Sequence, residues 1–389
     1  MINLFINGLA ASAGGGLTYL RNVIPHLAAR TDVRTTVAVS FQLRQELAGL
    51  CNISFLEVDH PPGAVRRFWH EQTVLPRIVR QSGADVVISA GNFALRRSPV
   101  AQILLSRNSL YTSADFFRDL RARREYRLRW DTRIRGMLAK RSIHWADCTV
   151  APSAAFAETL SRWAGVKVTP IHHGFDRDVF FSNQAPLPAD MRQTLDAGGS
   201  SLKLLFVSHY NYYRNFETLL RAIPHLRKRL VSRMVKLFLT CRLRSEENPG
   251  AYRAEAAAAL VHQLGIAENV VELGSVPHHL LHHVYRACDI YVTPAYAESF
   301  AHPLVEAMAS RLPVVASNLP VHREICGDAA LYFETFSAED LGERILRVAQ
   351  SESLAQGLAD RGGERSQDFS WQRHVDEMIS LARSLSRAA

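Results

Sequence analysis

The sequence has few cysteines and no long hydrophobic run. Its five cysteines are scattered over 389 residues, and no two of them form a C-x-x-C pair. This scarcity argues against a secreted disulfide framework or a zinc ribbon, and predicts reduced, mostly buried thiols in a cytosolic protein. No apolar segment approaches the roughly 18 residues that a membrane-spanning helix needs. The first residues show no basic leader and no small-residue cleavage site, so no signal peptide is expected.

Acidic residues are outnumbered by basic ones. The chain has 46 lysines and arginines against 37 aspartates and glutamates, which gives a net charge of +9. A basic protein attracts anions such as phosphates, nucleic acid or an acidic lipid surface. Nucleic acid is not an expected partner, because no interleaving of aromatic and basic residues and no nucleic-acid motif accompanies the charge.

Much of the basic excess lies between Phe117 and Lys140, where apolar residues recur at mixed spacings that are compatible with a helix. Two interpretations stay open. The segment Arg118–Arg141 can lie on an anionic membrane surface, as an amphipathic helix does. Alternatively, it is a solvated basic helix whose apolar side packs on the core.

Strand-like runs alternate with helical stretches, and the pattern restarts after residue 200, which predicts two doubly wound α/β domains. The expected domains are residues 1–172 and 173–369. Ligands bind such sheets beyond the carboxyl ends of the strands. The predicted strands are Ile2–Asn7, Thr35–Ser40, Ile53–Val58, Val86–Ser89, Ala101–Leu105, Cys148–Ala151, Lys203–Val207, Val235–Thr240, Val270–Leu273, Ile290–Thr293, Val314–Ser317 and Ala330–Tyr332.

The most informative stretch is the string AESFAHPLVEAMAS at residues 297–310. It follows a predicted strand and enters a helix near Pro303, since proline is preorganised for a first helical turn. A helix N-terminus in this place offers backbone N–H groups to an anion. Glu298 lies in the loop and Glu306 about one turn into the helix. Their carboxylates can accept the paired hydroxyls of a ribose or hexose, although two surface glutamates reach the same spacing by chance.

This string resembles the signature of the retaining glycosyltransferases of the GT-B fold, specifically family four (group 1). That signature is a glutamate, seven residues and a second glutamate, followed by an Ala-Met-Ala helix and a Pro-Val-Val-Ala strand. The resemblance implies two Rossmann-like domains that face a central cleft, with the acceptor on the first and the donor on the second. It also implies that the C-terminal helix, about 370–389, packs back on the first domain. The resemblance continues through residues 317–333 and recurs at 151–153, 171–176, 206–220, 271–277 and 369–371.

The family assigns roles to both glutamates. Glu306 is expected to hold the ribose of the nucleotide, and Glu298 to lie by the donor sugar and diphosphate. Catalysis would be mainly electrostatic, because the leaving group is a nucleotide diphosphate. No cofactor, metal or protein nucleophile is expected, since retaining transfer is thought to proceed on one face with help from the donor phosphate. The loop residues expected to present backbone amides to the donor are Ser299, Phe300, Ala301, Pro303 and Leu304.

A second constellation follows the strand Lys203–Val207. The family usually places an arginine and, five positions later, a lysine on the diphosphate, and these positions match His209 and Arg214. Arg214 offers charge and a bidentate fork to a phosphate. His209 departs from the pattern, because histidine is neutral or partly charged near pH 7. It is open whether His209 replaces the arginine. We take His209, Arg214 and Glu298 as the catalytic candidates.

The first domain offers fewer candidates. Gly15 and Gly16 follow a strand and precede a helix, where glycines let the backbone approach a phosphate or sugar. We take both glycines as donor-binding candidates, with a flexible loop as the alternative. The run is not a G-x-G-x-x-G fingerprint, which counts against an NAD enzyme. In the family a histidine often follows the strand matched by Ala101–Leu105. Here Arg107 and Asn108 stand there instead, as candidates for contact with the sugar or acceptor.

Four histidines at 278, 279, 282 and 283 form two i, i+4 pairs that could bind a metal. No cysteine or acidic residue stands near them in sequence, so an incidental histidine-rich helix start, with no metal, is the preferred interpretation.

The expected function is transfer of a hexose from a nucleotide-diphosphate sugar to a glycan or lipid-linked hydroxyl, in lipopolysaccharide, exopolysaccharide or glycolipid assembly. The expected place is the cytoplasm, peripherally on the inner face of the plasma membrane. The alternatives are another GT-B enzyme, such as a nucleotide-sugar epimerase, or a non-catalytic nucleotide-sugar binder.

Overall fold

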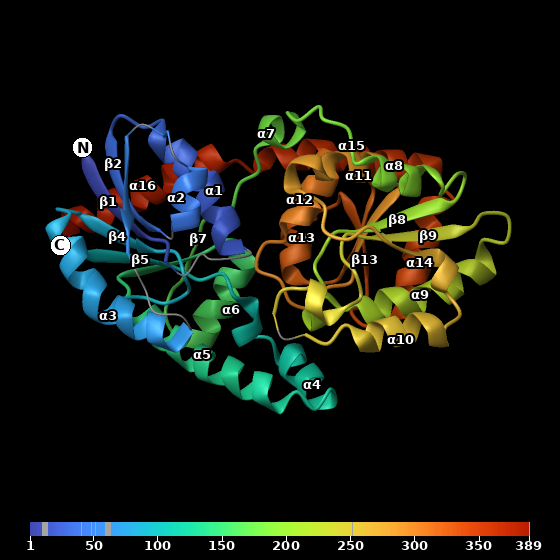
Figure 1. Ribbon diagram of the computed structural model, residues 1–389, viewed down its shortest axis with the longest axis horizontal. Helices are drawn as coiled ribbons and strands as arrows, with labels where there is room; N and C mark the ends of the chain where they lie inside the picture. Colours follow the sequence, from blue (N-terminus) through green and yellow to red (C-terminus); the bar gives the residue numbers. More distant parts are fainter. Residues whose placement is uncertain are drawn as a thin grey trace. The chain divides into compact units, whose positions relative to one another are not determined.

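The computed structural model describes residues 1–9, 15–39, 41–47, 49–50, 52–58, 64–250 and 252–388. The chain divides into two compact units. Unit 1 comprises Met1–Thr112, Trp130–Gly174 and Ser370–Ala389, and unit 2 comprises Ser113–Arg129 and Phe175–Phe369. Each unit contains one parallel sheet, as the alternating pattern predicts (Figure 1).

Unit 1 has a seven-stranded sheet in the order β3-β2-β1-β4-β5-β6-β7. Every pairing in it is parallel. The strands are β1 (Ile2–Asn7), β2 (Val33–Val39), β3 (Ile53–Glu57), β4 (Val86–Ser89), β5 (Ala101–Leu105), β6 (Cys148–Ala151) and β7 (Thr169–Pro170). The helices are α1 (Gly15–Ala28), α2 (Phe41–Glu46), α3 (Ala64–Gln81), η1 (Ser109–Tyr111), α5 (Tyr126–Trp145, whose first turn lies in unit 2), α6 (Ala154–Ala164) and α16 (Trp371–Ala388).

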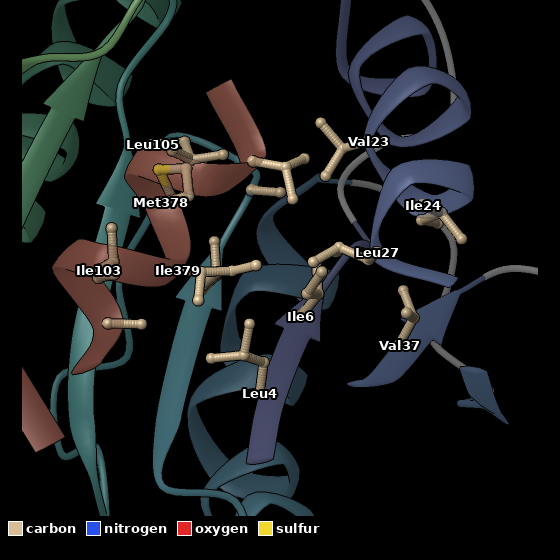
Figure 2. Packing of buried hydrophobic residues seen from close by; sticks show 14 of the residues in the cluster. Leu4, Ile6, Val23, Ile24, Leu27, Val37, Ile103, Leu105, Met378 and Ile379 are labelled. Carbon is tan, nitrogen blue, oxygen red and sulfur yellow. The ribbon is translucent and has the colours of Figure 1, made fainter. Parts of the chain in front are cut away.

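Alternate residues of β1 face opposite sides of this sheet, because side chains alternate along a strand. Leu4 and Ile6 join a cluster with α1 and α16. Phe5 joins a second cluster with Leu75 and Val79 of α3. Figure 2 shows the first cluster, in which Met378 and Ile379 of α16 lie among Leu4, Ile6, Ile103 and Leu105. The C-terminal helix is therefore part of the core of unit 1.

Unit 2 has a six-stranded parallel sheet in the order β10-β9-β8-β11-β12-β13. Its neighbouring interior strands β11 and β12 are buried along their whole length, as expected for strands covered on both faces. The strands are β8 (Leu202–Phe206), β9 (Val235–Leu239), β10 (Val270–Glu272), β11 (Ile290–Thr293), β12 (Val314–Ser317) and β13 (Ala330–Phe333). The α-helices are α4 (Ala114–Ala122), α7 (Arg177–Phe181), α8 (Ala189–Asp196), α9 (Phe216–Arg229), α10 (Glu255–Gln263), α11 (Leu281–Arg286), α12 (His302–Ala309), α13 (Pro320–Cys326), α14 (Ala338–Ala349) and α15 (Glu352–Arg365).

The basic segment differs from the expectation of a single helix. It forms α4 and α5, and the break falls at Arg124, whose φ of 60° lies in the left-handed region. The expected first domain is one continuous range, residues 1–172. The observed unit 1 is interrupted, because Ser113–Arg129 belongs to unit 2. The physical reason is that α4 buries Phe116 and Leu120 completely within that unit.

Gly174 marks the place where the chain leaves unit 1 for the second time. A Cβ built on Gly174 would lie 2.0 Å from the backbone nitrogen of Trp371, where the returning chain enters α16. Only glycine allows two backbones to approach this closely. Among the described residues, no helix is both long and apolar enough to cross a bilayer.

Candidate functional site

Arg214 lies in a short 3-10 turn after β8. The turn spans Tyr212–Arg214 and ends at Asn215, whose φ of 56° is left-handed. Asparagine tolerates this conformation better than most residues. The Asn215 side chain donates a hydrogen bond of 3.1 Å to the Pro294 carbonyl, which lies directly after β11. The loops at the carboxyl ends of these neighbouring strands are thus tied together.

Glu298 belongs to the loop after β11 and forms an ion pair with Arg214. Both side chains are largely buried, with 19% of Arg214 and 8% of Glu298 exposed. The guanidinium also lies 5.2 Å from the centre of the Tyr213 ring, a cation–π contact. Its Nε has no hydrogen-bond partner in the part of the chain that the structure describes. The site therefore holds a fixed arginine with a remaining donor, which suits a phosphate.

Glu306 is buried in the second turn of α12, with 6% of the residue exposed. Its carboxylate accepts hydrogen bonds from the Tyr285 hydroxyl at 2.9 Å and from Nε2 of His278 at 3.2 Å. Burial by itself raises the pKa of Glu306. The bonds from His278 and Tyr285 and the charges of His278 and His302 outweigh burial, so the pKa lies below its usual value. The carboxylate is ionised near neutrality, and each oxygen keeps acceptor capacity for a ligand hydroxyl.

The loop between the two glutamates enters α12 through Ala301. This residue has a φ of 68°, which is uncommon for any residue other than glycine. Phe300, Ala301 and Leu304 are buried, and Pro303 stands in the first turn, where a missing N–H costs nothing. The predicted helix start near Pro303 thus matches the structure. The N-terminal end of a helix carries the positive end of its dipole, which favours an anion.

His209 is exposed at the start of the same loop as Arg214. Partial desolvation, and then the charge of Arg214, lower the pKa of the His209 imidazole. His209 is therefore mainly neutral at pH 7 and adds little positive charge beside Arg214.

In unit 1, the side chains of the candidates Arg107 and Asn108 form hydrogen bonds with backbone atoms of other residues in that unit. Arg107 donates to the Ala90 carbonyl and lies 4.8 Å from the centre of the Tyr19 ring. Burial lowers the pKa of the Arg107 guanidinium to about 10. Asn108 caps the 3-10 turn η1, since its side chain accepts a hydrogen bond of 3.0 Å from the Leu110 N–H.

Gly15 and Gly16 are the first residues of α1. Gly14, the first glycine of the run, lies outside the described residues.

Several residues of the site were missed by the sequence reasoning. Tyr285 and His278 hold Glu306, and Tyr213 stacks on Arg214. His322 is completely buried in α13, and its Nδ1 donates to the Ser317 carbonyl at 2.9 Å. His278 stands 28 positions before Glu306 in the sequence, so no local spacing pattern reveals that the two residues pair. The histidine cluster itself was a visible signal, but it was interpreted only as a metal site or an incidental helix start.

The histidine cluster is not simply an exposed helix start. His282 is 1% exposed and packs on Phe180 and Phe181. Nε2 of His283 lies 3.0 Å from the Ala185 carbonyl. Among the described residues, no group of three or more histidine, cysteine or acidic side chains is arranged to hold a metal ion.

Two family models match the chain. Residues 13–179 match the model described as Glycosyltransferase Family 4, and residues 189–365 match the model described as Glycosyl transferases group 1. The chain is 32% identical over 113 residues to the O-antigen chain mannosyltransferase B of Escherichia coli, covering 29% of this chain and 30% of that protein. It is 26% identical over 219 residues to the D-inositol 3-phosphate glycosyltransferase of Corynebacterium aurimucosum, covering 55% and 50%. The matched part spans half or less of these two relatives.

Solved structures agree on the fold. Sucrose-phosphate synthase from Thermosynechococcus elongatus superposes with a TM-score of 0.74 at 19% identity, covering 100% of both chains. HepE of Anabaena, solved with UDP-glucose, also gives 0.74, at 16% identity and over 99% and 100% of the two chains.

The two Rossmann-like units define a GT-B glycosyltransferase fold, which confirms the fold class expected from the sequence. The two family models, which together match most of the chain, place it among the group 1 glycosyltransferases of family 4.

Proposed function

We propose that this protein is a retaining glycosyltransferase that moves a hexose from a nucleotide-diphosphate sugar to a hydroxyl acceptor. The observation that carries the proposal is the buried, ionised Glu306 beside a helix N-terminus and the Arg214–Glu298 pair. A carboxylate that can accept ribose hydroxyls therefore lies on the helix whose positive end can attract a phosphate. The UDP-glucose complex of HepE is consistent with a donor of this class.

In the proposed reaction, the acceptor oxygen forms a bond to the anomeric carbon, and the bond from that carbon to the diphosphate oxygen breaks. The hydroxyl proton passes to the leaving diphosphate. Negative charge grows on the diphosphate, and preorganised positive groups stabilise such charge most effectively. Arg214 and the N-terminal end of α12 supply that stabilisation. Glu298 and the Tyr213 ring fix the orientation of Arg214 in advance. His209 stands where the family usually has an arginine, which is always charged. We propose that His209 contacts the donor as a neutral hydrogen-bonding group instead.

The acceptor side is assigned to unit 1, where Arg107 remains a candidate for contact with the sugar or acceptor. Gly15 and Gly16 remain candidates for contact with the donor. Asn108 is a weaker candidate, because its side chain already caps η1.

The test is a panel of nucleoside diphosphates and nucleotide sugars added to the purified protein, with thermal unfolding as the readout. A ligand at 100 times its dissociation constant stabilises the folded state by about 2.7 kcal/mol, so binding should raise the melting temperature. A shift with one base would identify the donor class. No shift with uridine, guanosine or adenosine diphosphates and their sugars would contradict the proposal.

The acceptor is proposed to be lipid-linked or a surface polysaccharide, assembled in lipopolysaccharide, exopolysaccharide or glycolipid synthesis at the inner face of the plasma membrane. Helix α5 supports a membrane contact. Its buried residues are mostly small, namely Thr132, Gly136, Ala139, Ser142 and Ile143. Four of its large apolar side chains are exposed instead: Tyr126 by 55%, Trp130 by 60%, Ile134 by 52% and Met137 by 57%.

These four residues follow a spacing that places them on one side of α5, which favours the membrane interpretation over one in which this side packs on the core. Exposed Arg127, Arg133, Arg135, Lys140 and Arg141 accompany them. An aromatic and apolar stripe with basic neighbours suits an anionic lipid surface.

Co-sedimentation with phosphatidylglycerol vesicles tests the membrane contact. The wild-type protein should bind at low salt and be released as salt rises, because a Debye length of about 10 Å at 0.1 M screens the charges. Trp130→Ser with Ile134→Ser should weaken binding, whereas Arg162→Ala, an exposed arginine of α6, should not. Absence of wild-type binding at low salt would contradict the contact.

A further inference from the structure

We propose that helix α4 positions both loops of the donor site, with Arg123 as the central positioning residue. The proposal rests on the proposed function, because it assigns a role to the loops that carry Arg214 and Glu298. In chain order, α4 falls between β5 and β6 of unit 1, but Ser113–Arg129 is part of unit 2. A segment that stands between two strands of unit 1 in the sequence is thus part of unit 2 in the structure.

Arg123 joins two carboxylates just after the end of α4. Its Nε donates to Asp119 Oδ1 and its Nη2 donates to Glu217 Oε1, each at 2.8 Å. The guanidinium carbon lies 4.3 Å from the centre of the Tyr212 ring. Arg123, Asp119 and Glu217 are only 22%, 18% and 11% exposed, so water screens their charges weakly. This junction is a largely buried network rather than a surface ion pair.

Three tyrosines stand just before Arg214. Each contacts α4 itself, Glu125 after α4, or Glu217, which Arg123 binds. The Tyr210 hydroxyl donates to Glu217 Oε1 at 3.1 Å, the same oxygen that Arg123 binds. The Tyr212 hydroxyl donates to Glu125 Oε1 at 2.9 Å. The Tyr213 ring, which also stacks on Arg214, lies 6.3 Å from the Phe116 ring of α4 in an edge-on contact.

The second loop is held by the same helix. The Tyr296 hydroxyl donates to Asp119 Oδ2 at 2.8 Å, so one carboxylate joins Arg123 to Tyr296. The Tyr296 N–H donates to the Tyr213 carbonyl at 3.0 Å, and Tyr296 stands two residues before Glu298. The residues that precede both Arg214 and Glu298 are therefore fixed against α4 and against each other.

Loss of Arg123 would leave two mostly buried carboxylates without their cation and loosen the stack on Tyr212. Small displacements of groups that contact a ligand are costly even when the mutated residue touches no ligand. We therefore expect Arg123→Ala to weaken nucleoside diphosphate binding by roughly tenfold to a hundredfold. Arg123→Lys keeps the charge but cannot bridge two carboxylates in a planar fork, so it should restore binding only in part.

The experiment combines titration calorimetry using UDP, GDP and ADP with hydrogen exchange of the protein without ligand. In Arg123→Ala, peptides covering residues 208–216 and 294–300 should exchange faster, while the strands of unit 2 keep their protection. Arg229→Ala is the matched control, since it removes another arginine–glutamate pair of unit 2, that with Glu343. It should change neither loop exchange nor affinity.

Tyr296→Phe covers the case in which Arg123→Ala does not fold, because it removes only the hydroxyl that Asp119 accepts. It should speed exchange at 294–300 and lower affinity several-fold. A folded Arg123→Ala variant with unchanged loop exchange and unchanged affinity would overturn the positioning role. If the wild-type protein binds none of the three diphosphates, the proposed function fails, and hydrogen exchange alone still decides whether α4 holds the loops.

Discussion

The two units hold their polar candidate residues in different ways. In unit 2, Arg214 pairs with Glu298, and Glu306 is held by Tyr285 and His278. In unit 1, Arg107 bonds to a backbone carbonyl and Asn108 caps a turn. Side chains that are oriented by other side chains keep lone pairs and N–H groups available for a ligand. The difference favours unit 2 as the proposed place of an anionic, hydroxyl-rich ligand, because its candidate side chains are oriented by other side chains, whereas Arg107 and Asn108 bond to the backbone of unit 1.

The largest effect is expected from Arg214→Ala. The substitution removes the group that we propose stabilises charge on the leaving diphosphate, and it leaves Glu298 without its partner. Loss of one such preorganised donor lowers turnover by about a hundredfold to a thousandfold. The measurement is release of UDP from UDP-glucose and of GDP from GDP-mannose in the presence of a membrane extract. An unchanged rate in the folded variant would show that the pair in unit 2 has no catalytic part.

A smaller effect concerns pH and is expected in unit 2. Burial lowers the pKa of His322 to about 4, against about 6.5 in an unfolded chain. The unfolded state therefore binds the proton more readily, and stability falls as pH drops from about 6.5 towards about 4. Between pH 7.5 and pH 5 the loss attributable to His322 should be about 2 kcal/mol.

The two units can be followed separately in this experiment. All five tryptophans, at positions 69, 130, 145, 163 and 371, lie in unit 1, so their fluorescence reports that unit. Hydrogen exchange across residues 314–326 reports unit 2. Once the rates are corrected for the pH dependence of intrinsic amide exchange, acid should lower the protection of these amides in the wild-type protein, and less so in His322→Asn. Equal acid sensitivity in both proteins would exclude His322 as the cause.

The smallest effect is expected from Asn108→Ala. Losing the cap of η1 should lower the free energy of unfolding by about 1 kcal/mol. Because the side chain serves the fold of unit 1, nucleoside diphosphate affinity should stay the same. Urea unfolding followed by tryptophan fluorescence, with calorimetry on the same variant, measures both quantities. A variant of unchanged stability that loses activity would return Asn108 to the list of acceptor contacts.

The fold could be predicted because strand and helix periodicity are local. β1, β4, β5, β6, β11 and β12 have the predicted bounds, whereas β7 has two residues and no detectable period. Arg124 shows where local reasoning fails, since its left-handed conformation divides a segment with continuous helical character. The docking of α4 in unit 2 depends on contacts with residues about 90 to 180 positions away, such as Glu217 and Tyr296, which no spacing rule contains.

The candidate site, like the fold, could be predicted only in part. Glu298 and Glu306 belong to one string with a strong family resemblance, and Arg214 to a second stretch after another strand. The structure places Arg214 against Glu298. Tyr285 and His278, which hydrogen-bond to Glu306, come from a different part of the chain. The pairing of Glu306 with these two residues arises from packing of α11 and the preceding turn near α12. Only three-dimensional structure brings it into view.

The most direct test of the central claim is calorimetric titration of UDP, GDP and ADP into the wild-type protein, Glu306→Gln and Asn108→Ala. The account predicts that the wild-type protein binds one of these diphosphates, that Glu306→Gln loses most of this affinity, and that Asn108→Ala keeps it. Undiminished binding by a folded Glu306→Gln variant would contradict the assignment of the nucleotide to unit 2.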